Sequence, residues 1–321
     1  MEPGRVKHRS QEPARTSRGA GLIVPGVITR VAAYIVLLAL AVVVLAPLFW
    51  LLCAAFKGPQ DLFHYSFLPI DWGEMGQDLQ NGRLLICARD LWVGLSRFTV
   101  ANFRTLAGLD PPFYVHAINS VFVSTAVVLL QLFFSSLAGF ALAKYEFPGK
   151  RPLMIVMLAT MMIPGQVLLA PMYDLIYRMG LVDTYWALTI PGAVSVFGII
   201  LFRQSMLQIP DQLLDAGRID GCSEFRIYWE IAMPVSRPMV GAFTLIAFMG
   251  AWNSFLWPQI VLNTRERFTL PIALNEMVGL YEQQYGALMA GTLVSILPVA
   301  ILFFVLQKEF LAGLTAGAVK G

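Results

Sequence analysis

Residues 117–143 read AINSVFVSTAVVLLQLFFSSLAGFALA and contain no Asp, Glu, Lys, Arg or His. An α-helix needs about 20 such residues to cross the ~30 Å hydrocarbon core of a bilayer. A membrane-spanning β-strand would be about half as long and would alternate between apolar and polar residues. This stretch therefore predicts a membrane-spanning helix.

Five further stretches also lack these five residue types, namely 31–56, 152–173, 184–202, 238–264 and 283–307. Hydrophobic residues make up 57% of the 321 residues and charged residues 13%, whereas soluble proteins have roughly 45–50% and ~25%. The stretch 31–56 exceeds the roughly 7–15 apolar residues of a secretory signal, so we expect it to remain as an anchor. The composition predicts an all-α integral membrane protein with six transmembrane helices.

The distribution of Lys and Arg predicts the orientation. Of 23 such residues, 15 lie in segments 1–30, 144–151, 203–237 and 308–321. Short loops rich in Lys and Arg stay in the cytoplasm, so both termini are expected there. The expected domains are a disordered cytoplasmic tail (1–30), a six-helix transmembrane domain (31–309) with an extracytoplasmic loop (57–116), and a cytoplasmic C-terminal tail (310–321).

The sequence contains no recognisable catalytic, metal or cofactor site. The pair Gly149-Lys150 is followed by Arg151, so the phosphate-binding pattern GxxxxGK[ST] is absent. The three cysteines lie far apart, and basic residues form no stripe that would bind nucleic acid. The six apolar stretches hold no Asp, Glu, Lys, Arg or His, which argues against ion-coupled transport. Any energy for transport is therefore expected from another polypeptide.

The cytoplasmic loop 207–237 predicts two short helices joined by a turn. Asp211 is a candidate N-cap of the first helix, Gly221 suits the turn, and Ser223 can cap the second helix. In that second helix four apolar residues recur at i, i+3, i+4 and i+7, which are Phe225, Tyr228, Trp229 and Ala232. Such a face, without a core of its own, predicts a groove on a partner protein. The alternative is a helix resting on lipid headgroups, which the acidic residues of the loop disfavour.

This loop resembles the EAA motif of ATP-binding-cassette (ABC) importer permeases. The motif is matched in spacing by Asp215-Ala216-Gly217, Gly221 and the segment 231–234, IAMP. Asp215, Gly217 and Met233 replace Glu, Ala and Leu of the usual pattern. The segments 251–258 (AWNSFLWP) and 313–321 (GLTAGAVKG) are similar to the carbohydrate branch of the family, related to the maltose transporter. Residues 71–97 look like an insertion and receive no role.

The resemblance implies the type I importer fold in the bacterial inner membrane. It also implies four kinds of partner: a second permease, an ATPase dimer that binds ATP and Mg, an extracytoplasmic solute-binding protein, and the lipid bilayer. The residues implied in contact with the ATPase are Leu213, Leu214, Asp215, Ala216, Gly217, Asp220, Gly221, Phe225 and Pro234.

The resemblance to the carbohydrate branch implies a sugar as the substrate. The neutral polar groups in the apolar stretches suit an uncharged, hydroxyl-rich solute, and sugars also stack on aromatic rings. Trp252, Asn253 and Gln259 are the candidates that border its path. Helix–helix hydrogen bonding is the other interpretation of these polar groups. Two alternative functions are a permease for another solute, such as a glycerol-phosphate ester, and a free-standing channel or membrane-embedded enzyme.

Overall fold

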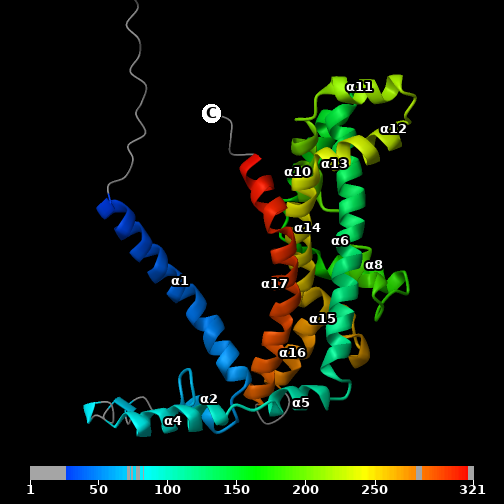
Figure 1. Ribbon diagram of the computed structural model, residues 1–321. Coiled ribbons are helices and arrows are strands. Elements are labelled where there is room, and N and C mark those ends of the chain that lie inside the picture. Colours follow the sequence, from blue (N-terminus) through cyan, green and yellow to red (C-terminus); the bar gives the residue numbers. More distant parts are fainter. Residues whose placement is uncertain are drawn as a thin grey trace, which may run out of the picture. The chain divides into compact units, whose positions relative to one another are not determined.

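The computed structural model describes residues 27–70, 73, 75–76, 80–81, 83–279 and 284–316. These residues form helices and no strand (Figure 1). The α-helices are α1 (Val27–Ala55), α2 (Asp61–His64), α4 (Leu84–Ser96), α5 (Ala101–Ala107), α6 (Phe113–Lys144), α7 (Lys150–Thr160), α8 (Leu169–Arg178), α9 (Trp186–Thr189), α10 (Val196–Met206), α11 (Asp211–Ile219), α12 (Glu224–Arg226), α13 (Met233–Val235), α14 (Arg237–Trp252), α15 (Leu256–Val261), α16 (Leu270–Gly279) and α17 (Tyr285–Ala316). Three other turns of helix are η1 (Gly165–Leu168), the π-helical η2 (Ile227–Ala232) and η3 (Arg265–Arg267).

The chain divides into two units, residues 1–48 and residues 49–321. Of the first unit, the described residues are the N-terminal part of α1, so most of the predicted tail 1–30 lies outside the described residues. At the other end, α17 continues to Ala316, beyond the predicted start of the C-terminal tail at residue 310. The last five residues of the signature 313–321 lie outside the described residues.

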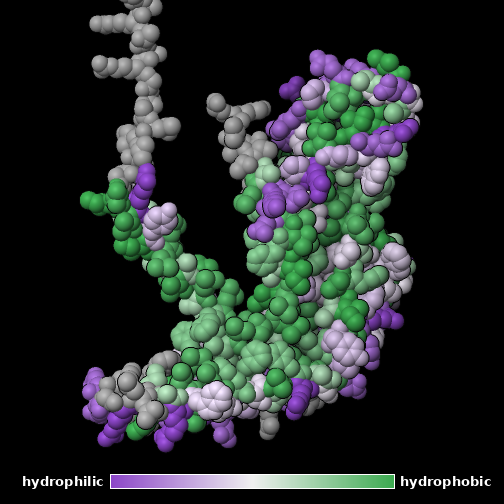
Figure 2. All heavy atoms as spheres, in the orientation of Figure 1, coloured by the Kyte–Doolittle hydropathy of each residue, from purple (hydrophilic) through white to green (hydrophobic). Residues whose placement is uncertain are grey.

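Three of the six predicted spanning helices are single, unbroken helices. They are α1, α6 and α17, each long and apolar enough to cross a membrane. In the second unit hydrophobic residues form a broad zone between two more hydrophilic ends (Figure 2). The expectation of an all-α membrane protein is therefore confirmed.

The prediction of one continuous helix is wrong for the other three stretches. Residues 152–173 form α7 and then η1–α8, bent by 94°, because Pro164 lacks a backbone donor and restricts the residue before it. Residues 184–202 hold the four-residue α9 and most of α10. The stretch 238–264 breaks after Trp252, and Pro258 lies in the first turn of α15, where proline is tolerated.

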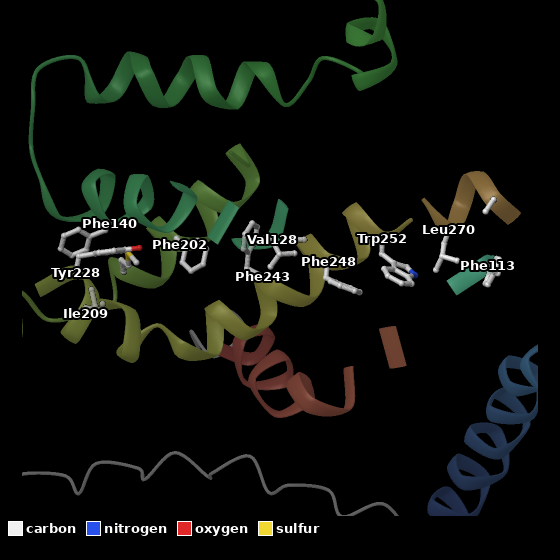
Figure 3. Packing of buried hydrophobic residues seen from close by; sticks show 14 of the residues in the cluster. Phe113, Val128, Phe140, Phe202, Ile209, Tyr228, Phe243, Phe248, Trp252 and Leu270 are labelled. Carbon is white, nitrogen blue, oxygen red and sulfur yellow. The ribbon is translucent and has the colours of Figure 1, made fainter. Parts of the chain in front are cut away.

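The core of the second unit lies where α6, α10, α14 and α17 pack together. Aromatic side chains follow one another along this core, among them Phe140, Tyr228, Phe202, Phe243 and Trp252 (Figure 3). Glycines allow the helices to approach closely. A Cβ atom at Gly139 of α6 would lie 2.6 Å from Cβ of Phe202 in α10. Small residues at such contacts are the usual means of packing helices in membranes.

At the end where α6 begins, the connecting segments are held by Asp183. This residue has φ 60°, and its carboxylate accepts hydrogen bonds from the backbone N–H groups of Asn263 (2.9 Å) and Thr264 (3.0 Å). Arg267 Nη1 donates to the same carboxylate at 2.9 Å. Burial alone would raise the pKa of Asp183, but the hydrogen bond from the Thr264 hydroxyl, the two backbone N–H groups and the nearby guanidinium lower it. The segment before α9 and the segment after α15 are thereby fixed to each other.

Candidate functional site

The cytoplasmic loop 207–237 and the outer loop 57–116 lie at opposite ends of α6. Helices α11, α12 and α13 lie near Lys144, the last residue of α6 (Figure 1). Helices α4 and α5 lie at the end where α6 begins. The excess of Lys and Arg predicts that the first of these ends faces the cytoplasm.

The start of α11 is tied to the end of α6 by one lysine. Lys144 Nζ donates to the carbonyl oxygen of Ile209 at 2.6 Å and to Oδ1 of Asp211 at 2.7 Å. The prediction that Asp211 caps α11 is wrong, because Pro210 occupies the cap position and the Asp211 carboxylate binds Lys144 instead. The hydrogen bond from Lys144 lowers the pKa of Asp211.

Arg218 joins the two helical arms of the loop. Its Nη1 donates to Asp215 at 2.6 Å within α11, and its Nε donates to Glu224 of α12 at 2.8 Å. The Tyr145 hydroxyl also donates to Glu224, which connects this pair to the end of α6. The hydrogen bond from Arg218, followed by that from Tyr145, lowers the pKa of Glu224. Asp215 of the EAA-like motif thus pairs within its own loop.

The turn between the two arms forms as the sequence predicts. Gly221 has φ +80°, a left-handed conformation that glycine adopts without steric cost. Ser223 caps the second arm, because its Oγ accepts a hydrogen bond from the Arg226 N–H at 3.3 Å. Both expectations for this turn are confirmed.

The predicted apolar face of the second arm is wrong. Tyr228 and Ala232 are fully buried, whereas Phe225 and Trp229 are each 56% exposed. The i, i+3, i+4, i+7 spacing assumes an α-helix, but residues 227–232 are π-helical, and the i→i+5 pattern of a π-helix rotates these residues apart. The Tyr228 hydroxyl lies 2.7 Å from Ser136 Oγ of α6, so the loop has a core that it shares with the spanning helices.

The residues expected to contact an ATPase therefore divide into two sets. Leu214 is buried and Gly217 faces Ile231, so both hold the loop to its own chain. The exposed members are Leu213, Asp215, Ala216, Asp220, Gly221, Phe225 and Pro234. Ile219 is 86% exposed at the end of α11, and sequence reasoning missed it. A helical wheel through Leu214 and Gly217 would have placed Ile219 on the outward side.

A cavity of about 430 Å³ lies between α6, α14, α15 and the segment 188–197. Its polar lining is neutral and consists of Ser120, Ser124, Gln131, Ser195, Ser254 and Thr269. Some of these groups already have partners within the chain. Gln131 Nε2 donates to the Gly192 carbonyl at 2.8 Å, and Ser120 Oγ accepts from the Leu270 N–H at 2.7 Å. The indole of Trp257 adds an aromatic surface.

The three candidates for the solute path lie beside this cavity rather than in its lining. Trp252 is buried, stacks on Phe248 and donates from Nε1 to the Ser295 carbonyl at 3.1 Å. Asn253 and Gln259 are exposed. The break after α14 turns their neighbours Ser254 and Trp257 toward the cavity instead.

Comparison with known proteins gives consistent matches. Residues 131–312 match the family described as binding-protein-dependent transport system inner membrane component. The arabinooligosaccharides transport system permease protein AraQ of Halalkalibacterium halodurans is 40% identical over 229 residues, which cover 70% of this chain and 81% of AraQ. The lactose transport system permease protein LacG of Rhizobium radiobacter is 35% identical over 202 residues, covering 63% of this chain and 74% of LacG.

A solved structure shows the same fold. It is the crystal structure of a bacterial ABC transporter involved in the import of the acidic polysaccharide alginate, and the TM-score is 0.73 at 20% identity. The match covers 88% of this chain and 96% of that chain. The fold therefore agrees with the type I importer fold expected from the sequence.

Proposed function

This chain belongs to the family of binding-protein-dependent transport system inner membrane components, and from that premise we propose that it is the permease subunit of an ATP-driven sugar importer. In this proposal it lies in the bacterial inner membrane, forms half of the solute path and hydrolyses no ATP itself. A second permease, an ATPase dimer and an extracytoplasmic solute-binding protein complete the assembly. The names of the relatives support the sugar class.

One observation supports the proposed coupling of this chain to the ATPase. The loop exposes apolar side chains, above all Ile219 and Phe225, on a segment that is rigidly tied to α6. Exposed apolar groups on a fixed support suit a groove on a partner protein. Motion of an ATPase that holds this surface would reach α6 through Tyr228 and through the Lys144 and Arg218 contacts. Because the α12–α13 arm meets α14 at a bend of 82°, the same motion of the loop would also tilt α14.

The cavity supports a neutral solute over a phosphate ester. The residues that line it include hydroxyl groups, an amide and an indole, and none of them carries a charge. Sugars match such a lining, because they stack on aromatic faces and exchange hydrogen bonds with neutral groups. A glycerol-phosphate ester would bring a dianion into a place without a cation, which is costly in a membrane interior. Ser254 and Trp257 replace Trp252 as the proposed contacts of the solute.

The test uses the full chain co-expressed with its second permease and ATPase. We expect Ile219→Glu to lose most ATPase co-purification and uptake, while Ile219→Met retains both, because only the first change puts a charge into an apolar groove. Full ATPase recovery with Ile219→Glu would contradict the coupling role. Transport by the purified chain alone would instead favour a free-standing channel.

The solute class is tested separately with the cognate binding protein. Thermal stabilisation of that protein by an arabino-oligosaccharide or lactose, and none by glycerol 3-phosphate, is the expected result. Stabilisation by glycerol 3-phosphate alone would overturn the sugar class and leave the coupling role intact.

A further inference from the structure

The insertion 71–97, which received no role from the sequence, contains an amphipathic helix, α4. Ala88, Leu91, Trp92 and Leu95 recur at i, i+3, i+4 and i+7 and form one apolar stripe. Asp90 and Val93 lie on the opposite side of the helix. Trp92 is 75% exposed, and Leu91 and Leu95 are each 41% exposed.

The helix is attached to its own chain through a side other than this stripe. A Cβ atom at Gly94 would lie 2.5 Å from Cγ1 of Ile70 and 2.7 Å from the Pro69 carbonyl oxygen. The backbone of α4 therefore rests directly on the segment before it. Arg97, just after the helix, donates to the Tyr65 hydroxyl at 2.8 Å and fixes the C-terminal end. The apolar stripe is left facing outward on a fixed support.

The position of α4 indicates what covers the stripe. Figure 1 shows α4 lying across the direction of α6, at the end where α6 begins. A helix in this orientation at the end of a spanning helix runs along the membrane surface. Large aromatic side chains are exposed at the same end, on Phe63 and Tyr114, as is common where proteins cross the boundary between lipid and water.

The apolar surface of the outer loop also continues into that of a spanning helix. The ring of Phe67 stacks on that of Phe49 in α1, with 5.9 Å between ring centroids. Phe49 and Leu52 are themselves exposed on the described part of α1 that belongs to this unit. Because a spanning helix presents such residues to lipid, the surface that joins it is expected to meet lipid too.

We propose that α4 is an interfacial helix that lies on the outer leaflet of the bilayer, with Trp92, Leu91 and Leu95 at the boundary between headgroups and acyl chains. A wide apolar stripe and an indole suit this position. Arg89 and its neighbour Asp90, 3.4 Å apart, are the charged residues of α4 and cancel each other, so the helix has no net positive charge for anionic lipid to attract. It anchors the outer loop and fixes the height of that loop above the membrane.

The test uses spin labels on full-length chain in vesicles of phosphatidylethanolamine and phosphatidylglycerol. Cys53, Cys87 and Cys222 are replaced by Ala, and single cysteines are introduced as Trp92→Cys on the stripe and Asp90→Cys on the opposite side as the control. Leu95→Cys and Val93→Cys form a second matched pair that leaves Trp92 intact. We expect collisions with oxygen, relative to a water-soluble nickel chelate, to be several-fold more frequent at 92 and 95 than at 90 and 93.

Three results would overturn the proposal. Equal access of the nickel chelate to both sides of α4 would place the helix in water. If the second permease is added and the label at 92 then collides less often with both oxygen and the nickel chelate, the stripe contacts that subunit instead of lipid. Immobilisation of the label at 92 by the solute-binding protein would assign it to that protein. The measurement on the chain alone needs no transport, so it stands or fails separately from the proposed function.

Discussion

Nζ of Lys144, the last residue of α6, lies 2.7 Å from Oδ1 of Asp211, the first residue of α11. The two residues are 67 positions apart in the sequence. The Lys144 side chain is only 6% exposed, and its second hydrogen bond goes to the Ile209 carbonyl. A spanning helix and the cytoplasmic loop are therefore joined at a single, shielded amino group.

Replacement of Lys144 by Met should uncouple the loop from α6. We expect the variant to insert into the membrane but to lose uptake several-fold, because two hydrogen bonds that set the direction of α11 are removed. Lys150→Met is the matched control, since it removes the same charge from the same cytoplasmic segment while its ion pair with Glu146 is local. Uptake by both variants is compared at equal protein in the membrane. Equal losses would argue against a specific role of Lys144.

Acidification should loosen the loop through Glu224. Its pKa is lowered in the folded chain, so its contribution is fully present above its ordinary pKa and is lost as the pH falls through the lowered value. Hydrogen–deuterium exchange of residues 211–226, corrected for intrinsic rates, should rise over that range. Glu224→Gln should exchange faster already at neutral pH and show less dependence on pH. Glu230→Gln, whose partner Arg226 lies in the same arm, should behave like the parent chain.

Substitution of Gly221 tests whether backbone conformation alone sets the turn. No heavy atom lies within 4 Å of a Cβ built at this residue, so Val meets no clash but must adopt the left-handed conformation at a cost of about 1–2 kcal/mol. We expect Gly221→Val to uncouple ATP hydrolysis from uptake while the subunit still inserts. Asn tolerates this conformation, so Gly221→Asn should stay coupled. Normal substrate-stimulated hydrolysis with Val would refute the prediction.

Gly139→Ala should destabilise the contact between α6 and α10. The added methyl group would lie 2.6 Å from Phe202 Cβ and 2.9 Å from the Arg203 backbone nitrogen, and overpacking of this kind costs about 1–3 kcal/mol. The midpoint of thermal unfolding in detergent should fall. At Gly192 the nearest atom would be 3.6 Å away, so Gly192→Ala should leave the midpoint nearly unchanged.

A substitution at Trp252 should affect stability but not transport, and a substitution at Ser254 should affect transport but not stability. Trp252→Phe removes the buried hydrogen bond to Ser295 and should lower the unfolding free energy by about 1 kcal/mol, with the solute affinity of the assembly unchanged. Ser254→Val, in the cavity lining, should weaken uptake without lowering the unfolding midpoint. A change of solute affinity with Trp252→Phe would return Trp252 to the solute path.

The sequence predicted the features that depend on composition and local backbone chemistry. Charge-free length identified α1, α6 and α17, and the residue types at Gly221 and Ser223 identified the turn. The interruption at Pro164 could also have been predicted, because proline breaks or kinks a helix through its own backbone chemistry. A count of apolar residues treats Pro as one more uncharged residue, and this is why the bend was missed.

Other features depend on contacts between distant segments. Tyr228 becomes buried because Ser136 and Phe140 of α6 lie beside it, and the π-helical turn that allows this has no local signature in residues 227–232. The sequence places Lys144 in a charged segment that is expected in the cytoplasm, but it does not reveal that Lys144 pairs with Asp211. The sequence could not predict that Ser254 and Trp257 line the cavity, because their direction depends on the break after α14.

The 94° bend between α7 and α8 should constrain how this segment evolves. An interrupted helix persists at membrane depth only where protein or a water-filled cavity covers its backbone. Met162 at this bend is 84% exposed on the isolated chain. We expect the second permease to supply that cover in the proposed assembly. Residues 161–164 should then change over generations in step with a surface encoded by another gene, and the two genes should be gained and lost together.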